Sequence, residues 1–491
     1  MTHLPILIPA SLFLAAFLVP LAGMMRRGLV PVVALLGAGA ATAAALLGLC
    51  KVLDEGALHY QLGNWPAPVG IEYILDPLAS YMTVVVTVSG FISLVYFSPA
   101  VEDEIPDRFI ISHAVALLLL AGLCGMIVTG DLFNLFVFLE IASLSAYGLV
   151  AIGEKHAPVA AFRYLILGSL AGSFYVLGVG FLYFATGSLN MADVANRVVP
   201  LYSSRAVAAA ALLIALAMAL KMALFPLHPW LPDAYTYAPS AVAGLIPPIM
   251  TKVAAYVLMR VFLGVFQPHY GTQELPLLPV ISWLAAAGIL FGSIMAIAQK
   301  DLRRMLAYSS VSQIAYVGLG LGMAHPLGLI GALLHVMNHA VMKAGLFFVA
   351  GLVRRRTGQV EISQLTGLGR QMPWTMAAFT VAALSMVGVP PTAGFFSKWY
   401  LLLGALEVSN PWFVAVILIS SLLNAVYFFR ILENLYAKSS RQEVIVNRGD
   451  TPPRMVAPAV VLAVALLVLG LGNSIIVTQV LEPIAGGFYR R

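Results

Sequence analysis

The feature that most constrains the fold of this chain is a series of long apolar segments separated by short polar loops. Windows of about twenty apolar residues, the length that crosses a bilayer as a helix, can be placed along the whole sequence. They lie at roughly 4–24, 29–50, 77–98, 110–129, 131–152, 158–186, 206–226, 239–265, 276–299, 303–323, 326–352, 373–405, 411–436 and 456–481. The sequence therefore predicts an all-α polytopic membrane protein with about fourteen transmembrane helices.

The composition agrees, because 61% of the 491 residues are apolar and 10% are charged, whereas soluble proteins carry about a quarter charged residues. The first apolar run lacks a basic leader segment, so we expect a retained helix. Cys50 and Cys124 lie inside apolar runs and indicate neither a disulfide framework nor a thiolate metal site. The net charge of +6 reflects basic loops, not nucleic-acid binding. No nucleotide-binding or iron–sulfur motif occurs, so we expect no cofactor and no catalytic chemistry on this chain.

Basic residues are divided unequally between the two sides of the predicted helices. With Arg26 and Arg27 placed inside, the inner loops also hold Arg108, Lys155, Lys300, Arg303, Arg304, Arg354, Arg355, Arg356, Arg370, Lys438, Arg441, Arg448 and Arg454. The other side holds Lys51, Arg197, Arg205, Arg490 and Arg491. Because basic loops remain on the cytoplasmic side, we expect both termini outside.

Charged residues inside the apolar segments are candidates for function. Glu140 lies near the middle of "GDLFNLFVFLEIASLSAYGLV" (residues 130–150), where a carboxylate is costly to bury. Lys221, Lys252 and Lys398 are flanked by apolar sequence on both sides, and Lys343 is an intermediate case. The alternative for each lysine is that it reaches the headgroups, as we expect of Arg260 and Arg430.

Glu140 and Lys221, on different predicted helices, could form a proton switch. A lysine has an ordinary pKa of about 10.4, which falls on desolvation and is held up by a nearby carboxylate. Separating the two residues would then release a proton, and reuniting them would take one up. The alternative is a static buried ion pair, which stabilises weakly.

Prolines near two of the lysines indicate broken helices. Pro226 follows Lys221 by five residues, and Pro390 and Pro391 precede Lys398. Broken membrane helices are tolerated where they line protein or water, and ion-coupled transporters use them. The alternative is that the prolines end helices near the membrane surface.

His335, His339 and Lys343 recur every four residues and share one helix face, with Asn338 beside them. This stripe suits a proton relay, because histidine titrates near neutral pH. Core packing and a metal site are the alternatives, although the zinc-protease pattern is absent. Further polar positions that could hold water are Ser143, Tyr147, His228 and Asn424.

In their order, these motifs resemble the antiporter-like subunits of Mrp-type cation/proton antiporters, respiratory complex I and membrane-bound hydrogenases. The similar segments are "GDLFNLFVFLEIASLSAYGL", "LKMALFPLHPWLPDAYTYAPSAVAGLIPPIMTKVAAYVLMR", "DLRRMLAYSSVSQIAYVGLGL", "ALLHVMNHAVMKAGLFFVAG" and "GVPPTAGFFSKWYLLLGAL". The resemblance is greatest to Mrp D subunits. One departure is Asp233, where many D subunits would carry a small or neutral residue.

The resemblance implies fourteen helices, with inverted five-helix repeats at helices 4–8 and 9–13 and breaks in helices 7 and 12. It implies an N-terminal part (1–108), a first repeat (109–265), a second repeat (276–436) and a C-terminal part (437–491). Glu140 and Lys221 would be the inner ion pair, Lys252 the central relay, His335 and His339 the onward link and Lys398 the exit. The implied location is a prokaryotic cytoplasmic (inner) membrane.

Three functions remain open for such a chain. It could be the proton-translocating subunit of an Mrp-type Na⁺ or K⁺/H⁺ antiporter, which we favour. It could instead be a proton- or sodium-pumping subunit of a redox-driven NADH:quinone oxidoreductase or hydrogenase complex, or a non-transporting assembly subunit. Other membrane subunits are expected partners in every case. The complete set of buried charges disfavours the non-transporting subunit.

Overall fold

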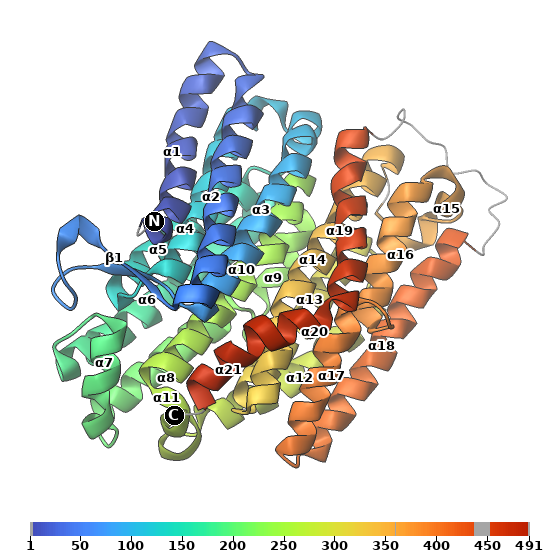
Figure 1. Cartoon of the computed structure of the whole chain (residues 1–491). Coiled ribbons are helices and arrows are strands. Elements are labelled where there is room, and N and C mark those ends of the chain that lie inside the picture. Colours follow the sequence, from blue (N-terminus) through green and yellow to red (C-terminus); the bar gives the residue numbers. More distant parts are fainter. Residues whose placement is uncertain (1–2, 359, 437–451, 490–491) are drawn as a thin grey trace.

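The computed structural model describes residues 3–358, 360–436 and 452–489, and most of these residues are helical (Figure 1). In this part of the chain, 11 helices are long and apolar enough to cross a membrane. Three more crossings are α13 (Leu302–Gly322), α8 (Arg205–Lys221) followed by α9 (Trp230–Tyr237), and α16 (Pro373–Val387) followed by α17 (Ala393–Glu407). The predicted fourteen-helix membrane fold is confirmed.

The 11 long helices are α1 (Leu4–Met25), α2 (Leu29–Glu55), α3 (Pro77–Glu104), α4 (Phe109–Val128), α5 (Leu132–Ala151), α6 (Ala157–Thr186), α10 (Ser240–Met259), α12 (Leu277–Ala298), α14 (Pro326–Thr357), α18 (Pro411–Tyr436) and α19 (Pro453–Leu471). The shorter elements are a hairpin of β1 (Leu58–Gln61) and β2 (Glu72–Leu75), α7 (Met191–Val198), α11 (Gln267–His269), α15 (Leu368–Gln371), α20 (Asn473–Ile476) and α21 (Glu482–Tyr489). A π-helical segment, η4 (Arg260–Val265), continues α10. Lys438, Arg441, Arg448, Arg490 and Arg491 lie outside the described residues.

The starts of α5 and α13 have the same local construction, 170 positions apart. Asp131 caps α5 by accepting a 2.7 Å hydrogen bond from the Asn134 amide. Asp301 caps α13 in the same way, at 2.8 Å from the Arg304 amide. Each cap sits in an antiparallel bridge to a later segment, at Asn190 for the first and Glu361 for the second. Because four crossings lie between the two helices, they run in opposite directions, as in an inverted repeat.

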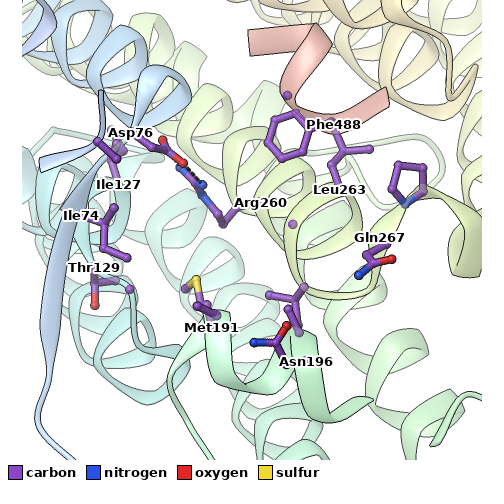
Figure 2. Close-up of a pocket in the computed structure, with 18 of the residues that line it drawn as sticks. Ile74, Asp76, Ile127, Thr129, Met191, Asn196, Arg260, Leu263, Gln267 and Phe488 are labelled. Carbon is purple, nitrogen blue, oxygen red and sulfur yellow. Dashed lines mark hydrogen bonds and ion pairs between the residues drawn. The ribbon is translucent and has the colours of Figure 1, made fainter. Parts of the chain in front are cut away.

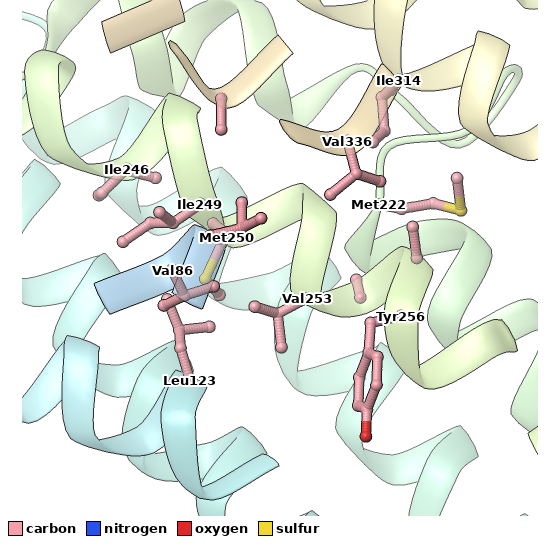
Figure 3. Packing of buried hydrophobic residues seen from close by; sticks show 14 of the residues in the cluster. Val86, Leu123, Met222, Ile246, Ile249, Met250, Val253, Tyr256, Ile314 and Val336 are labelled. Carbon is pink, nitrogen blue, oxygen red and sulfur yellow. The ribbon is translucent and has the colours of Figure 1, made fainter. Parts of the chain in front are cut away.

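The centre of the molecule is built around α10 and α14. Every residue of α10 is buried, and apolar side chains from α3, α4, α13 and α14 surround it, among them Val86, Leu123 and Val336 (Figure 3). Because lipid is as apolar as these side chains, close packing and buried hydrogen bonds hold membrane helices together. The outer helices expose large apolar side chains such as Phe17 and Phe184, as expected where hydrocarbon or a partner covers them.

Two crossings are interrupted inside the bundle. The α8 helix ends at Lys221, residues 222–229 are not helical, and α9 resumes the crossing. The α16 helix ends at Gly388, whose φ of +93° lies in the left-handed region that favours glycine. The breaks predicted at helices 7 and 12 are therefore confirmed. Proline removes a backbone donor at each of them, so the helical hydrogen bonds cannot continue.

One face of the bundle carries the hairpin, α7 and the last described helix, α21 (Figure 1). These elements surround a cavity of about 750 Å³ that Asp76 and Arg260 line (Figure 2). Arg260 does not reach outward as its position near a helix end suggested. Its side chain is 16% exposed and forms an ion pair with Asp76. Arg430 likewise binds carbonyls within the bundle, those of Ile297 and Gln299.

Ion pairs join the helices at the opposite face. Asp233 on α9 lies 2.8 Å from the Arg163 guanidinium of α6 and 3.2 Å from that of Arg304 on α13. Arg303 donates to the carbonyl oxygen of Ala238, the residue that ends α9. Asp233, the residue that departs from the family pattern, therefore links α9 to α6 and α13 through ion pairs.

Candidate functional site

Glu140 and Lys221 do not contact each other. The Lys221 ammonium donates hydrogen bonds to Ser143 Oγ (2.6 Å) and Tyr147 Oη (3.1 Å), and among the described residues it has no ion pair with Glu140. Ser143 and Tyr147 lie three and seven residues after Glu140 on α5, so they occupy the same helix face. The direct contact expected of the pair is absent because these two hydroxyl groups lie against the lysine instead.

Glu140 is half-buried, and its buried Oε1 atom has no hydrogen-bond partner in the described chain. It points at Gly172 of α6, where an added Cβ would overlap Oε1, and Gly168 one turn earlier leaves room for Tyr147 in the same way. In this arrangement the Glu140 carboxylate has no contact with the Lys221 ammonium, and the proton switch stays a prediction.

Lys252 lies at the centre of the bundle and is completely buried. Its ammonium donates a 2.6 Å hydrogen bond to the Pro247 carbonyl on the same helix. Its role as the central relay between the first break and the histidine stripe stays a prediction.

The histidine stripe of α14 is buried and incompletely hydrogen-bonded. His335 Nδ1 lies 3.0 Å from Ser397 Oγ, and the rings of His335 and His339 are 5.8 Å apart. Both ring nitrogens of His339, Nε2 of His335, Oδ1 of Asn338 and both amide atoms of Gln313 have no partner within the described chain. Buried polar atoms are nearly always satisfied by protein or by ordered water. We therefore infer that water lies along this stripe.

The second break presents backbone carbonyls to Lys398. Its ammonium donates 2.9 Å hydrogen bonds to the carbonyl oxygens of Met386 and Val387, where α16 ends, and a 3.2 Å bond to Ser421. It also lies 5.4 Å from the centre of the Tyr316 ring. These neutral acceptors hold an ammonium without a carboxylate. The broken helix is therefore the local reason that a lysine can be buried here.

The secondary candidates fall into two groups. Lys343 bonds Leu306 O (2.8 Å) and Ser309 Oγ (2.6 Å), and Asn424 accepts from Tyr427 at 2.9 Å, so both join buried polar networks of the second repeat. His228 lies in the first break against Phe225 and Phe291, and its Nδ1 atom has no described partner. The contacts of His228 do not connect it to the lysine and histidine positions.

Several residues of this site were not identified from the sequence. Ser397 Oγ lies 3.0 Å from His335 Nδ1, Gln313 is buried with no partner for its amide within the described chain, and Gly168 and Gly172 make room for the α5 side chains. The four-residue spacing of the two glycines is a usable signal, because small residues at that spacing mark close helix contacts. Gln313 has no comparable signal, since a single amide in a serine-rich helix is not distinctive.

Comparison with known proteins shows the family of this chain. Residues 129–424 match the family model described as "NADH:quinone oxidoreductase/Mrp antiporter, TM". The chain belongs to this family. It is 51% identical to NADH-quinone oxidoreductase subunit N of Desulforudis audaxviator over 86% of both chains. It is 33% identical to the Na⁺/H⁺ antiporter D subunit of Alkalihalophilus pseudofirmus, over 85% of this chain and 84% of that one.

Solved structures of family members share the whole fold. A chain of the Mrp complex from Dietzia is 27% identical, with a TM-score of 0.88 over 99% of this chain and 97% of that one. A chain of an archaeal membrane-bound sulfane sulfur reductase is 30% identical, with a TM-score of 0.89 over 98% and 97%. Both belong to multisubunit membrane assemblies. This family member is therefore an antiporter-like membrane subunit whose partners are other membrane subunits.

Proposed function

We propose that this subunit moves protons along a buried axis through Glu140, Lys221, Lys252, His335, His339 and Lys398. The observation that carries the proposal is the run of unpartnered polar atoms between Lys252 and Lys398. Water bound at these atoms would complete their hydrogen bonds and would supply the sites that a proton path needs. The Lys221 ammonium donates to Ser143 and has no contact with Glu140 in the described chain, which supports a switch with two arrangements rather than a fixed ion pair.

The proposed parent complex is an Mrp-type antiporter that exchanges Na⁺ or K⁺ for protons. The similarity to antiporter D subunits and to a chain of the Dietzia Mrp complex supports this parent. A second candidate is a redox-driven complex, and the 51% identity to an NADH-quinone oxidoreductase subunit N favours it. Either parent uses the same axis. We propose that this chain has four structural parts, at residues 1–108, 109–265, 276–436 and 437–491.

We propose that the face carrying the hairpin and α21 is the outer face of the cytoplasmic membrane. The support is the gathering of basic residues at the other face, where Arg27 donates to Pro106 O and Arg354 lies 4.0 Å from Glu104. Basic loops remain in the cytoplasm. Both termini would then face outward.

The test is proton transport by the intact complex in vesicles after Glu140→Ala, Lys221→Ala or Lys252→Ala. Lys51→Ala is the matched control, because Lys51 is a surface lysine paired with Glu55 at 2.9 Å. We expect transport to be lost in the three axis variants and retained in the control. Unchanged transport in assembled Glu140→Ala and Lys221→Ala complexes would refute the switch.

Mass spectrometry of the complex, purified gently through a tag on this chain, distinguishes the parents. If small hydrophobic subunits are the only proteins that copurify, the parent is the antiporter. Vesicle assays with sodium and pH jumps then follow. Subunits that carry iron–sulfur clusters or nickel indicate the redox-driven complex, and transport must then be measured with an electron donor.

A further inference from the structure

The cavity of about 750 Å³ at the face bearing the hairpin has a wall of both apolar and polar residues, and an ion pair forms part of its lining (Figure 2). Its wall includes Thr129, Asn196 and Gln267, from the loop after α4, from α7 and from the segment after η4. The ion pair of Asp76 and Arg260 forms the floor, and Nη2 of Arg260 lies 2.7 Å from Oδ1 of Asp76. These polar groups and the ion pair offer hydrogen-bond partners to water in the cavity.

A closed hydrogen-bonded cluster lies directly behind this floor. Tyr256 Oη donates to the Ile127 carbonyl at 2.6 Å and accepts from Arg260 Nε (3.1 Å) and Nη2 (2.9 Å). Asp76 in turn accepts from the Ala79 amide at 2.8 Å as the cap of α3. Oη of Tyr256 thus has all its hydrogen-bonding positions occupied. In this arrangement it offers no free position to a water molecule on the side of Lys252.

Lys252, Tyr256 and Arg260 are spaced four residues apart and so follow one face of α10 and its continuation. At a rise of 1.5 Å per residue, Arg260 lies about 12 Å along the helix from Lys252. Along α10, the cluster of Asp76, Arg260 and Tyr256 lies between Lys252 and the cavity, and the Lys252 ammonium, which donates to Pro247 O, is directed away from it.

The residue types in this cluster suit a gate. An arginine keeps its proton under all physiological conditions, so Arg260 cannot pass a proton on. Its positive charge repels protons and cations, as arginines do in selective pores. Asp76 neutralises that charge and fixes the guanidinium across the path. Separation of the two side chains would free Tyr256 and admit water.

The second repeat offers an instructive comparison. Arg430 lies 170 positions after Arg260 and binds the carbonyls of Ile297 and Gln299 at 3.0 and 2.9 Å. Ile297 is itself 170 positions after Ile127, the acceptor of Tyr256. In both repeats, an arginine from the last helix therefore lies near the carboxyl end of the first helix, α4 in one repeat and α12 in the other. In the first repeat, the arginine pairs with an acid and faces a cavity.

We propose that this cavity is a water-filled proton vestibule, and that Asp76, Arg260 and Tyr256 form the gate that closes it to Lys252. The proton leaves the Lys252 ammonium for water when the gate opens, so that the lysine becomes a neutral amine and the vestibule gains the proton. This proposal rests on the proposed role of Lys252. It adds an outlet in the first repeat that lies before the histidine stripe and Lys398.

The first test is passive proton leak through vesicles that contain the purified intact complex, with a pH gradient imposed and no driving substrate. Wild-type complex should hold the gradient, and Arg260→Gln should dissipate it several-fold faster. Asp76→Asn should leak as well, because asparagine keeps the cap of α3 while losing the charge that holds Arg260. Adding Lys252→Met to Arg260→Gln should abolish the leak.

The second test uses chemical access to the cavity. Cys50 is exposed and is replaced by alanine, while the buried Cys124 stays. A membrane-impermeant cationic thiol reagent, added from the face bearing the hairpin, should then block transport by Asn196→Cys. Ser203→Cys is the control, because Ser203 is exposed near the same face but does not line the cavity. It should be labelled without loss of transport.

The outcomes separate this proposal from the proposed function. If Lys252→Met alone transports normally, the axis is wrong and the vestibule with it. If Lys252→Met abolishes transport but assembled Arg260→Gln and Asp76→Asn complexes hold the gradient, only the gate is overturned. A leak that persists without Lys252 also overturns it. Should Arg260→Gln fail to assemble, Asp76→Asn and the labelling experiment decide.

Discussion

Lys221 and Ser143 are joined by a 2.6 Å hydrogen bond, and Tyr147 completes the neutral surroundings of the ammonium. Glu140, one turn before Ser143 on α5, is left with an unpartnered carboxylate oxygen. The carboxylate and the two hydroxyl groups therefore offer the lysine alternative partners on one helix. Exchange of these partners is what the proposed switch requires.

The carboxylate of Glu140 is expected to matter through its charge. Glu140→Gln keeps the shape of the side chain, and transport should fall about ten- to hundredfold, the range that a coupling of about 1–3 kcal/mol between two sites produces. Glu140→Asp should retain part of the activity, because the charge remains but its reach is shorter. Proton transport by vesicles with equal amounts of assembled complex checks both variants. Equal loss in the two would contradict a role for the charge.

The hydroxyl partners of Lys221 are expected to act together. Ser143→Ala and Tyr147→Phe each remove one hydrogen bond to an ammonium, and such bonds contribute about 1.5–3 kcal/mol. Either variant should therefore lower transport partially, while the double variant should lower it more than either and reduce thermal stability. Ser145→Ala, a buried serine on the same helix that is no partner of Lys221, is the control. Normal transport by the double variant would show that the acid alone is sufficient.

The number of helices and the two breaks could be predicted from the sequence, because both depend on local properties. Apolar length marks each crossing, and proline beside Lys221 and Lys398 marks each interruption. The partners of the lysines could not be predicted, because they depend on how each helix is rotated about its axis. The same rotation places Ser143, rather than Glu140, against Lys221.

The surroundings of Arg260 and Gln313 could not be predicted from the sequence for another reason. Arg260 stands near a helix end, which predicted a side chain directed toward the headgroups. Its actual partner, Asp76, is 184 positions away in the chain, and nothing local indicates the pair. Gln313 is similar, since its amide is buried without a partner in the described chain and nothing local in the sequence indicates this.

The glycine at 172 is expected to position Glu140. An alanine there would overlap the Oε1 atom and push the carboxylate away from α6, so Gly172→Ala should reduce transport strongly. Gly180→Ala on the same helix is the matched control, because its added Cβ has no neighbour within 4 Å. Both changes remove a helix glycine and should favour the helix by about 1 kcal/mol. Equal transport by the two variants would argue against this role.

Gly388 is expected to serve both the backbone and Lys398. Gly388→Ala forces an alanine to a φ of +93° and brings its Cβ to 3.2 Å from the Cδ atom of Lys398. Gly358→Ala imposes similar backbone strain at a φ of +69° but has no neighbour within 4 Å. Each should lose about 1–2 kcal/mol of stability. Only Gly388→Ala should also lose transport, as measured at a temperature where both complexes remain assembled.

The unpartnered amide of Gln313 yields the most discriminating prediction, because stability and transport should change in opposite directions. Replacing a buried polar group that lacks a partner by an apolar one of similar shape is neutral or stabilising. Gln313→Leu should therefore keep or raise the unfolding temperature of the complex. The same change removes two buried polar atoms to which water can bind, so proton transport should fall severalfold. A purely structural amide would give the reverse result, with a lower unfolding temperature and transport that follows the amount of intact complex.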